Sequence, residues 1–424
     1  MSDNERSGSN EDANERAYPE FTGTVESPSL NAEVSIRVAE DRLHIESAFD
    51  DLVVMYADIE AFVFQNHTVR LTVNEDRIVL SKMGREGEWL FQALEEAYNA
   101  KVTDALHVRG RHLAQASGSF RYGDSAGQGR FCLFEDCLMI LPPNRMARRL
   151  PFLFMRALKR EDHTLIITMD DGQEYQLAQM GSDLDVLERG INAGVRSCHA
   201  MNVRHIEQLD PTLSAALSAR AARDWPEGVA VPYSKIEKNY PSLVRSIEKK
   251  VRASRMGETL PVLQKTCDGS RLSLGCKGLT ESEAEALKAA IQGDSSEEEP
   301  SELSPEQEDA LRWIFWLAIP SKEGQRVVVE FAFPGEPAAT YVFRTARDFD
   351  SFLAVLNRAL EAGQLQRENI LLPSDKLSQD RYADERILID RTPELQEIRK
   401  ALAGRAIHRS GEGWKNSVLK LLEM

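Results

Sequence analysis

One pattern occurs twice in this chain. Residues 67–84 read HTVRLTVNEDRIVLSKMG, and residues 163–181 read HTLIITMDDGQEYQLAQMG. Further matched pairs keep nearly the same separation: Glu40-Asp41 with Glu135-Asp136, Met83-Gly84 with Met180-Gly181, and Leu94-Glu95 with Leu187-Glu188. The separation changes by only a few residues, as insertions and deletions in loops produce. The chain therefore predicts a duplicated domain, and its fold must be one that a small unit can adopt twice.

Each copy passes from the hydrophobic period of strands to that of a helix. Short alternating segments between residues 33 and 82 predict β-strands, the last two forming a hairpin that turns at residues 74–76, and residues 85–102 predict an amphipathic helix. The apolar stripe expected on this helix is Leu90, Leu94, Ala97 and Val102, with Phe91 and Tyr98 beside it. The second copy predicts strands from residue 129, a hairpin turning at Asp171-Gly172, and a helix over residues 182–197. Its stripe is Leu184, Leu187, Ile191 and Val195.

A third, fainter copy is predicted near the C-terminus. Residues 258–278 are expected to supply its opening strands, a hairpin is expected to turn at Pro334-Gly335, and residues 348–363 predict a helix. An acidic insert at residues 294–309 interrupts this copy and has no basic residue. Such a run is read as a solvated loop, or as a docking segment for a basic partner.

Composition limits the classes of function. The chain has 424 residues and a formal net charge of -16, which disfavours binding to a phosphate backbone, so no nucleic-acid partner is expected. Its five cysteines have no Cys-x-x-Cys pair, and no segment is apolar and long enough to predict a transmembrane span. We therefore expect a soluble, cytoplasmic protein whose residues 1–18 form a disordered acidic tail.

Motifs that suggest chemistry do not form a site. GDSAG, residues 123–127, matches the Gly-x-Ser-x-Gly pattern of hydrolases, but the repeat places Ser125 in a loop between strands. Cys198-His199 with His205 has no neighbouring ligands at the usual zinc spacing. We expect no catalytic residues, metal or cofactor, and so no enzyme.

Seven or so antiparallel strands closed by one C-terminal helix resemble the pleckstrin-homology (PH) superfold, here as a tandem bacterial PH-like protein. Trp89 lies near where that family usually keeps a tryptophan. The resemblance implies an α+β chain of tandem PH-like small β-barrels or orthogonal sandwiches, each capped by a helix, and it implies binding without naming the ligand. The predicted segments are PH-like domains at 19–106 and 107–198, a helical linker at 199–257, a third unit at 258–363 and C-terminal helices at 364–424.

The second copy is richer in arginine than the first. Lipid-binding members of the superfold hold inositol phosphates with basic residues of the first hairpin, where charge-assisted bonds replace phosphate hydration. The candidate ligand-binding residues are Arg121, Arg130, Arg145, Arg148 and Arg149. The leading hypothesis is a non-catalytic adaptor that binds a protein or peptide partner. The alternatives are peripheral binding to anionic membrane lipid through the second domain, and a chaperone of basic proteins that uses the acidic segments.

Overall fold

The structure is a computed structural model that describes residues 19–254, 256–285, 305–332, 339–408 and 411–423. The predicted acidic tail and most of the acidic insert at 294–309 lie outside these residues. The chain divides into two compact units, Met1–Asp104 with Pro143–Arg145, and Ala105–Pro142 with Met146–Met424. Within the described ranges, no helix has the length and apolar character needed to cross a membrane.

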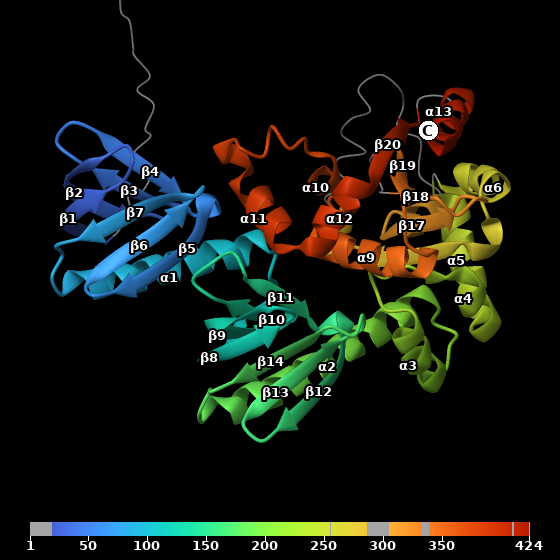
Figure 1. Cartoon of the computed structure of the whole chain (residues 1–424). Helices are drawn as coiled ribbons and strands as arrows, with labels where there is room; N and C mark the ends of the chain where they lie inside the picture. The colour runs from blue at the N-terminus through green and yellow to red at the C-terminus, as the bar shows by residue number, and fades with distance from the viewer. Residues whose placement is uncertain (1–18, 255, 286–304, 333–338, 409–410, 424) are drawn as a thin grey trace, which may run out of the picture. The chain divides into compact units, whose positions relative to one another are not determined.

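The first unit is one antiparallel sheet followed by one helix (Figure 1). Its elements are β1 (Glu20–Glu26), β2 (Asn31–Val38), β3 (Arg42–Glu46), β4 (Asp51–Met55), β5 (Ile59–Gln65), β6 (Thr68–Val73), β7 (Asp76–Ser81) and α1 (Glu86–Ala105). The strand order is β4-β3-β2-β1-β7-β6-β5. The repeated stretch at residues 67–84 therefore contains the β6–β7 hairpin and the turn into α1, which confirms the hairpin expected there.

The second unit begins with a sheet of the same design. Its elements are β8 (His112–Tyr122), β9 (Ser125–Phe134), β10 (Cys137–Leu141), β11 (Arg148–Pro151), β12 (Met155–Glu161), β13 (Thr164–Met169), β14 (Glu174–Ala178) and α2 (Asp183–Leu209). The order β11-β10-β9-β8-β14-β13-β12 repeats that of the first sheet strand for strand. The predicted turn at Asp171-Gly172 is confirmed, with Gly172 at a positive φ of 86° that suits glycine. Ser125 begins β9 directly after the turn from β8, so the GDSAG segment joins two strands.

The α+β class is confirmed, but both sheets are open, so of the two expected forms, small β-barrels and orthogonal sandwiches, closed barrels are wrong. In the first unit, closure would require hydrogen bonds between β4 and β5, which stand at opposite ends of the strand order. A 3-10 turn at Tyr56–Asp58 links these two strands, and it buries Tyr56 and Ala57. The opening between the end strands is filled by side chains and by the helix: the rings of Phe62 and Tyr98 have centroids 5.1 Å apart.

The stripe of α1 differs from the prediction by one position. Leu90, Leu94, Tyr98 and Val102 are fully buried, whereas Ala97 is only half-buried. Tyr98 displaces Ala97 because a large ring fills the space between the sheet and the helix that a methyl group would leave empty.

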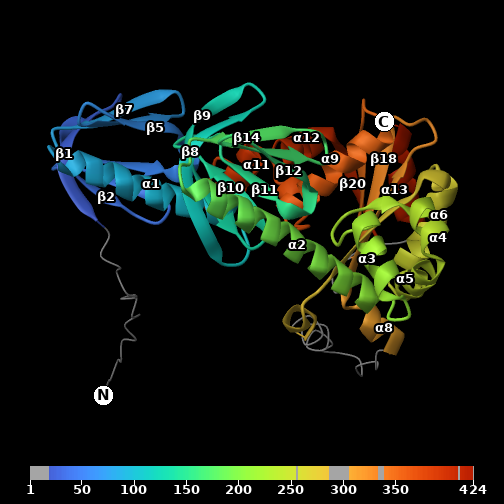
Figure 2. The same ribbon diagram turned by 90° about the horizontal axis from the view of Figure 1, so that it is seen from below.

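The remainder of the second unit joins helices to a third sheet (Figure 2). Helix α2 extends beyond the second sheet and packs against α3, as Figure 2 shows. The helices are α3 (Ala215–Asp224), α4 (Tyr233–Asn239), α5 (Pro241–Ala253), α6 (Met256–Thr266), α8 (Pro305–Ala310), α9 (Phe349–Ala362), α10 (Glu368–Leu371), α11 (Ala383–Arg391), α12 (Pro393–Ala401) and α13 (Gly411–Glu423). The strands are β15 (Val231–Pro232), β16 (Ser273–Gly278), β17 (Trp313–Pro320), β18 (Arg326–Ala332), β19 (Ala339–Arg344) and β20 (Leu402–Ile407).

The third sheet has a different topology from the first two. Its order, β15-β16-β17-β18-β19-β20, follows the sequence of its strands. Strands β18 and β19 pair as predicted, but the expected turn at Pro334-Gly335 lies outside the described residues. The strand expected to begin at residue 258 is instead helix α6, whose buried Met256, Thr259 and Leu263 recur at helical spacing.

The C-terminal region also contains one unexpected strand. Residues 402–407 continue a segment expected to be helical, but they form β20 and pair with β19. A side chain at Gly404 would meet α13, because a Cβ atom at this position would lie 2.6 Å from a methyl carbon of Leu421. Glycine therefore lets α13 pack closely on this edge strand.

Candidate functional site

The hairpin arginines of the second sheet, Arg121 and Arg130, stand four positions apart on neighbouring strands. Arg121 is exposed on β8 and lies opposite Ala126, whereas Arg130 is half-buried on β9 and lies opposite Ser117. Four positions along a strand separate the two sites by about 13 Å.

Arg145 belongs to the first unit. Its guanidinium donates to the backbone oxygen of Asp58 at 3.2 Å, and it lies 3.7 Å from the carboxylate of Glu60. Arg145 therefore contacts the region of β5 in the first sheet. Although Arg145, Arg148 and Arg149 are close in sequence, they do not form one basic cluster.

Arg149 is engaged by two carboxylates of its own chain. Its terminal nitrogens lie 2.8 Å from Asp136 and 2.8 Å from Glu361, and its side chain is 7% exposed. Burial opposes the charge, but the neighbouring carboxylates raise the pKa of Arg149 above its ordinary value. This guanidinium joins the β9–β10 turn to α9.

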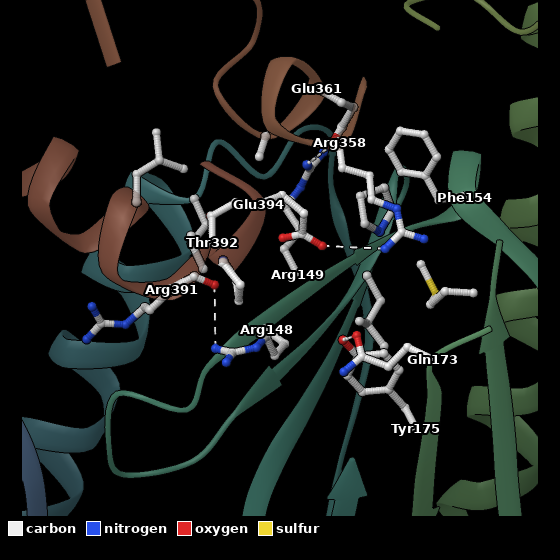
Figure 3. Close-up of a pocket in the computed structure, with 17 residues that line it drawn as sticks. Arg148, Arg149, Phe154, Gln173, Tyr175, Arg358, Glu361, Arg391, Thr392 and Glu394 are labelled. Atoms are coloured by element: carbon white, nitrogen blue, oxygen red, sulfur yellow. Dashed lines mark hydrogen bonds and ion pairs between the residues drawn. The ribbon is translucent and has the colours of Figure 1, made fainter. Parts of the chain in front are cut away.

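Arg148 lines a small cavity of about 180 Å³ in the second unit (Figure 3). Its Nη1 donates to the backbone oxygens of Ala147 at 2.8 Å and Arg391 at 3.5 Å. The guanidinium carbon lies 5.2 Å from the centre of the Tyr122 ring, within cation–π range. Carbonyl oxygens and an aromatic face thus stabilise this charge.

A second arginine closes the opposite side of the same cavity. Arg358 of α9 forms an ion pair with Glu394 of α12 (Figure 3). It also forms ion pairs with Asp170 and Asp171 at the β13–β14 turn. Burial raises the pKa of the lining Tyr175, so its phenol is protonated. These ion pairs neutralise most of the charged side chains that line this cavity. They also hold α9 and α12 against the second sheet.

The first unit offers a different kind of site, at the edge of β5. The segment Pro143–Arg145 adds to this edge as a short antiparallel partner, with Asn144 opposite Ala61. Phe62 N–H donates to Pro143 C=O at 2.9 Å, and Arg145 N–H donates to Glu60 C=O at 3.0 Å. The Tyr98 hydroxyl of α1 donates to the Asn144 carbonyl at 3.2 Å. The edge of β5 thus holds an extended segment by its backbone.

The rest of this edge is open for pairing. Alternation along an antiparallel strand directs the N–H and C=O of Phe62 and Phe64 to the side away from β6. Pro143 has no N–H to give to the Phe62 carbonyl, so the ladder stops there. In the part of the chain that the structure describes, no backbone hydrogen bond extends it to Phe64.

Side chains beside the open edge are apolar. The rings of Phe64 and Phe91 are half-buried, with centroids 5.9 Å apart, between β5 and α1. Val63 on the outer face of β5 is 49% exposed. Trp89 lies elsewhere: it is two positions from Gly87, which packs on Phe64, and therefore about 200° further round the helix.

Sequence reasoning did not find this edge. The available signal was Pro142-Pro143, because two residues without N–H groups often mark a segment that ends a β-ladder. Nothing in the sequence placed that segment against β5.

No protein-family model matches the chain, and no curated protein resembles it. Among the described residues, no group of three or more His, Cys, Asp or Glu side chains is arranged to hold a metal ion.

Proposed function

We propose that this protein is a non-catalytic adaptor that binds an extended peptide segment of a partner protein by adding a strand to β5. The observation that carries the proposal is the antiparallel pairing of Pro143–Arg145 with Glu60–Phe62. An edge that already accepts one extended segment has the geometry for another, and strand addition draws its affinity from backbone hydrogen bonds.

The scaffold supports this proposal. Two sheets share one strand order, and each is followed by a helix, which is the plan expected of tandem PH-like domains. In the first unit, β5 is an end strand of the sheet. Beside it, between β5 and α1, the side chains of Phe64 and Phe91 form an apolar strip. A partner peptide would pair with Phe62 and Phe64 through its backbone and place an apolar side chain on this strip.

A selection from a random peptide library on the purified full-length chain tests the proposal, with affinities measured by calorimetry. Val63→Lys and Phe64→Pro should weaken binding of the selected peptides by about tenfold or more, because they disturb the outer face and remove an edge donor. Val53→Lys is the matched control, since Val53 is 41% exposed on β4, the opposite end strand. If no peptide is enriched, or if Val53→Lys weakens binding as much as Val63→Lys, the proposal fails.

Binding to anionic membrane lipid through the second domain is the second candidate, and the exposed guanidinium of Arg121 favours it. Its other supports are weaker, because Arg145 and Arg149 pair with carboxylates of this chain. Sedimentation with phosphatidylserine vesicles should then be salt-sensitive and lost in Arg121→Glu. Sedimentation that is unchanged by salt and by this substitution would remove the candidate.

A further inference from the structure

The apolar strip beside β5 has a rim of carboxylates on α1. Glu88 and Glu95 lie three positions before and four positions after Phe91, so the three side chains share one face of the helix. The Phe91 ring contacts Phe64 of β5, with 5.9 Å between the centroids, which turns this face toward the open edge. A peptide that adds to β5 would therefore pass beside both carboxylates.

The two carboxylates differ in their contacts. Glu88 is exposed, and among the described residues it forms no ion pair and no side-chain hydrogen bond. Glu95 is half-buried and has another interaction within the chain. A carboxylate accepts up to about four hydrogen bonds, so Glu95 can still bind a further donor. The rim can thus bind basic side chains that come from outside the chain.

The segment that already lies on this edge brings a cation to a carboxylate. Pro143–Arg145 pairs with Glu60–Phe62 through its backbone. The Arg145 guanidinium lies 3.7 Å from the carboxylate of Glu60 and donates to the backbone oxygen of Asp58 at 3.2 Å. This intramolecular segment thus combines an extended backbone with a basic side chain beside a carboxylate of β5.

The second sheet has an ion pair between its end strand and its helix. Arg160 on β12 is the repeat counterpart of Phe64 on β5, because each is the last residue but one of its strand. The Arg160 guanidinium lies 2.6 Å from Asp185 and 3.0 Å from Glu188 of α2. Glu188 is the counterpart of Glu95 in the repeat. In the first sheet phenylalanine replaces the arginine, so a cation at this place has to come from a partner.

We propose that the partner segment is basic, with an apolar residue on Phe64 and Phe91 and a lysine or arginine two positions to either side of it. This proposal rests on strand addition to β5. Residues two apart in a strand lie on one face, and the two basic residues of such a segment are about 13 Å apart. Glu88 and Glu95 are about 10.5 Å apart along the helix axis. The long, flexible side chain of lysine can span the difference.

The probe is the fluorescein-labelled peptide Thr-Val-Lys-Thr-Leu-Thr-Lys-Val-Thr, titrated with the full-length protein at low salt and followed by fluorescence anisotropy. Glutamine in place of both lysines should weaken binding by about tenfold, because exposed ion pairs contribute modestly. Glu88→Lys and Glu95→Lys should each weaken binding of the lysine peptide by about fivefold and leave binding of the glutamine peptide unchanged. Glu96→Lys is the matched control, since Glu96 is exposed and lies about 140° round α1 from Phe91.

The outcomes separate this inference from the strand addition on which it rests. If the lysine and glutamine peptides bind equally well, or if Glu88→Lys has no more effect than Glu96→Lys, the preference for a basic partner is overturned while strand addition stands. If neither peptide binds, strand addition to β5 fails and the basic preference fails with it. Added salt should reduce the advantage of the lysine peptide, because it screens exposed charges. Circular dichroism of each variant establishes that it is folded.

Discussion

Arg149 binds Asp136 and Glu361 at the same time, with 2.8 Å from a terminal nitrogen to each carboxylate. Asp136 belongs to the turn between β9 and β10, and Glu361 to the last turn of α9. Arg358 of α9 makes a comparable connection to Asp170 and Asp171 at the β13–β14 turn. Two arginines therefore join the second sheet to α9, the helix that lies between β19 and β20 of the third sheet.

Replacing Arg149 should destabilise the second unit strongly. Arg149→Met leaves two carboxylates near each other without their shared cation, and breaking a buried pair in this way costs about 3–5 kcal/mol. The free energy of unfolding, measured by urea titration, should fall by that amount. Arg121→Met, at an exposed arginine of β8, should change it by about 0.5 kcal/mol or less. Equal effects of the two substitutions would contradict a joining role for Arg149.

Trp89 should account for the quenchable fluorescence of the protein. It is 59% exposed, while the other four tryptophans, Trp225, Trp313, Trp316 and Trp414, are buried. Iodide does not penetrate a packed interior, so it should quench Trp89 and spare the others. Trp89→Phe should therefore abolish most of the quenching at little cost in stability. Quenching that persists in this variant would show that another tryptophan is accessible.

The sequence predicted elements whose information is local. The β6–β7 and β13–β14 hairpins, α1 and α2 could be predicted because alternation and helical spacing are read within one segment. The segment at Glu258–Cys267 was misread because a short apolar run with a proline fits either period, and only its packing showed the helical one. The choice of Tyr98 over Ala97 for the buried stripe depended on the volume left beside Phe62.

The candidate sites depended on pairings that sequence does not carry. Arg145, Arg148 and Arg149 look like one basic cluster in the sequence, yet the structure gives them partners on β5, Tyr122 and α9 respectively. Long-range contacts decide which charge is neutralised, and neither spacing nor composition records them.

Cys198 should react slowly with alkylating reagents although it is only half-buried. Burial raises the pKa of its thiol to about 11, and nearby Glu361 and Asp136 act in the same direction. Only the thiolate reacts, so near neutral pH alkylation by iodoacetamide should be about two orders of magnitude slower than in the urea-unfolded chain, where cysteine has a pKa of about 8.5. Mass spectrometry of tryptic peptides measures both rates. Similar rates in the folded and unfolded chains would contradict this environment.

Lys277 should lose its proton at a lower pH in the folded protein than in the unfolded chain. Burial, and to a lesser extent the charge of Arg109, lower its pKa from 10.5, and the opposing effect of Glu227, Glu283 and Glu361 is smaller. Below the lowered value the charged amine is disfavoured by the fold, and this destabilisation is relieved as pH rises through that value toward 10.5. The pH dependence of acetylation at Lys277, followed by mass spectrometry, should accordingly have a midpoint below that in urea. A midpoint equal to that of the unfolded chain would contradict the burial of the Lys277 amine.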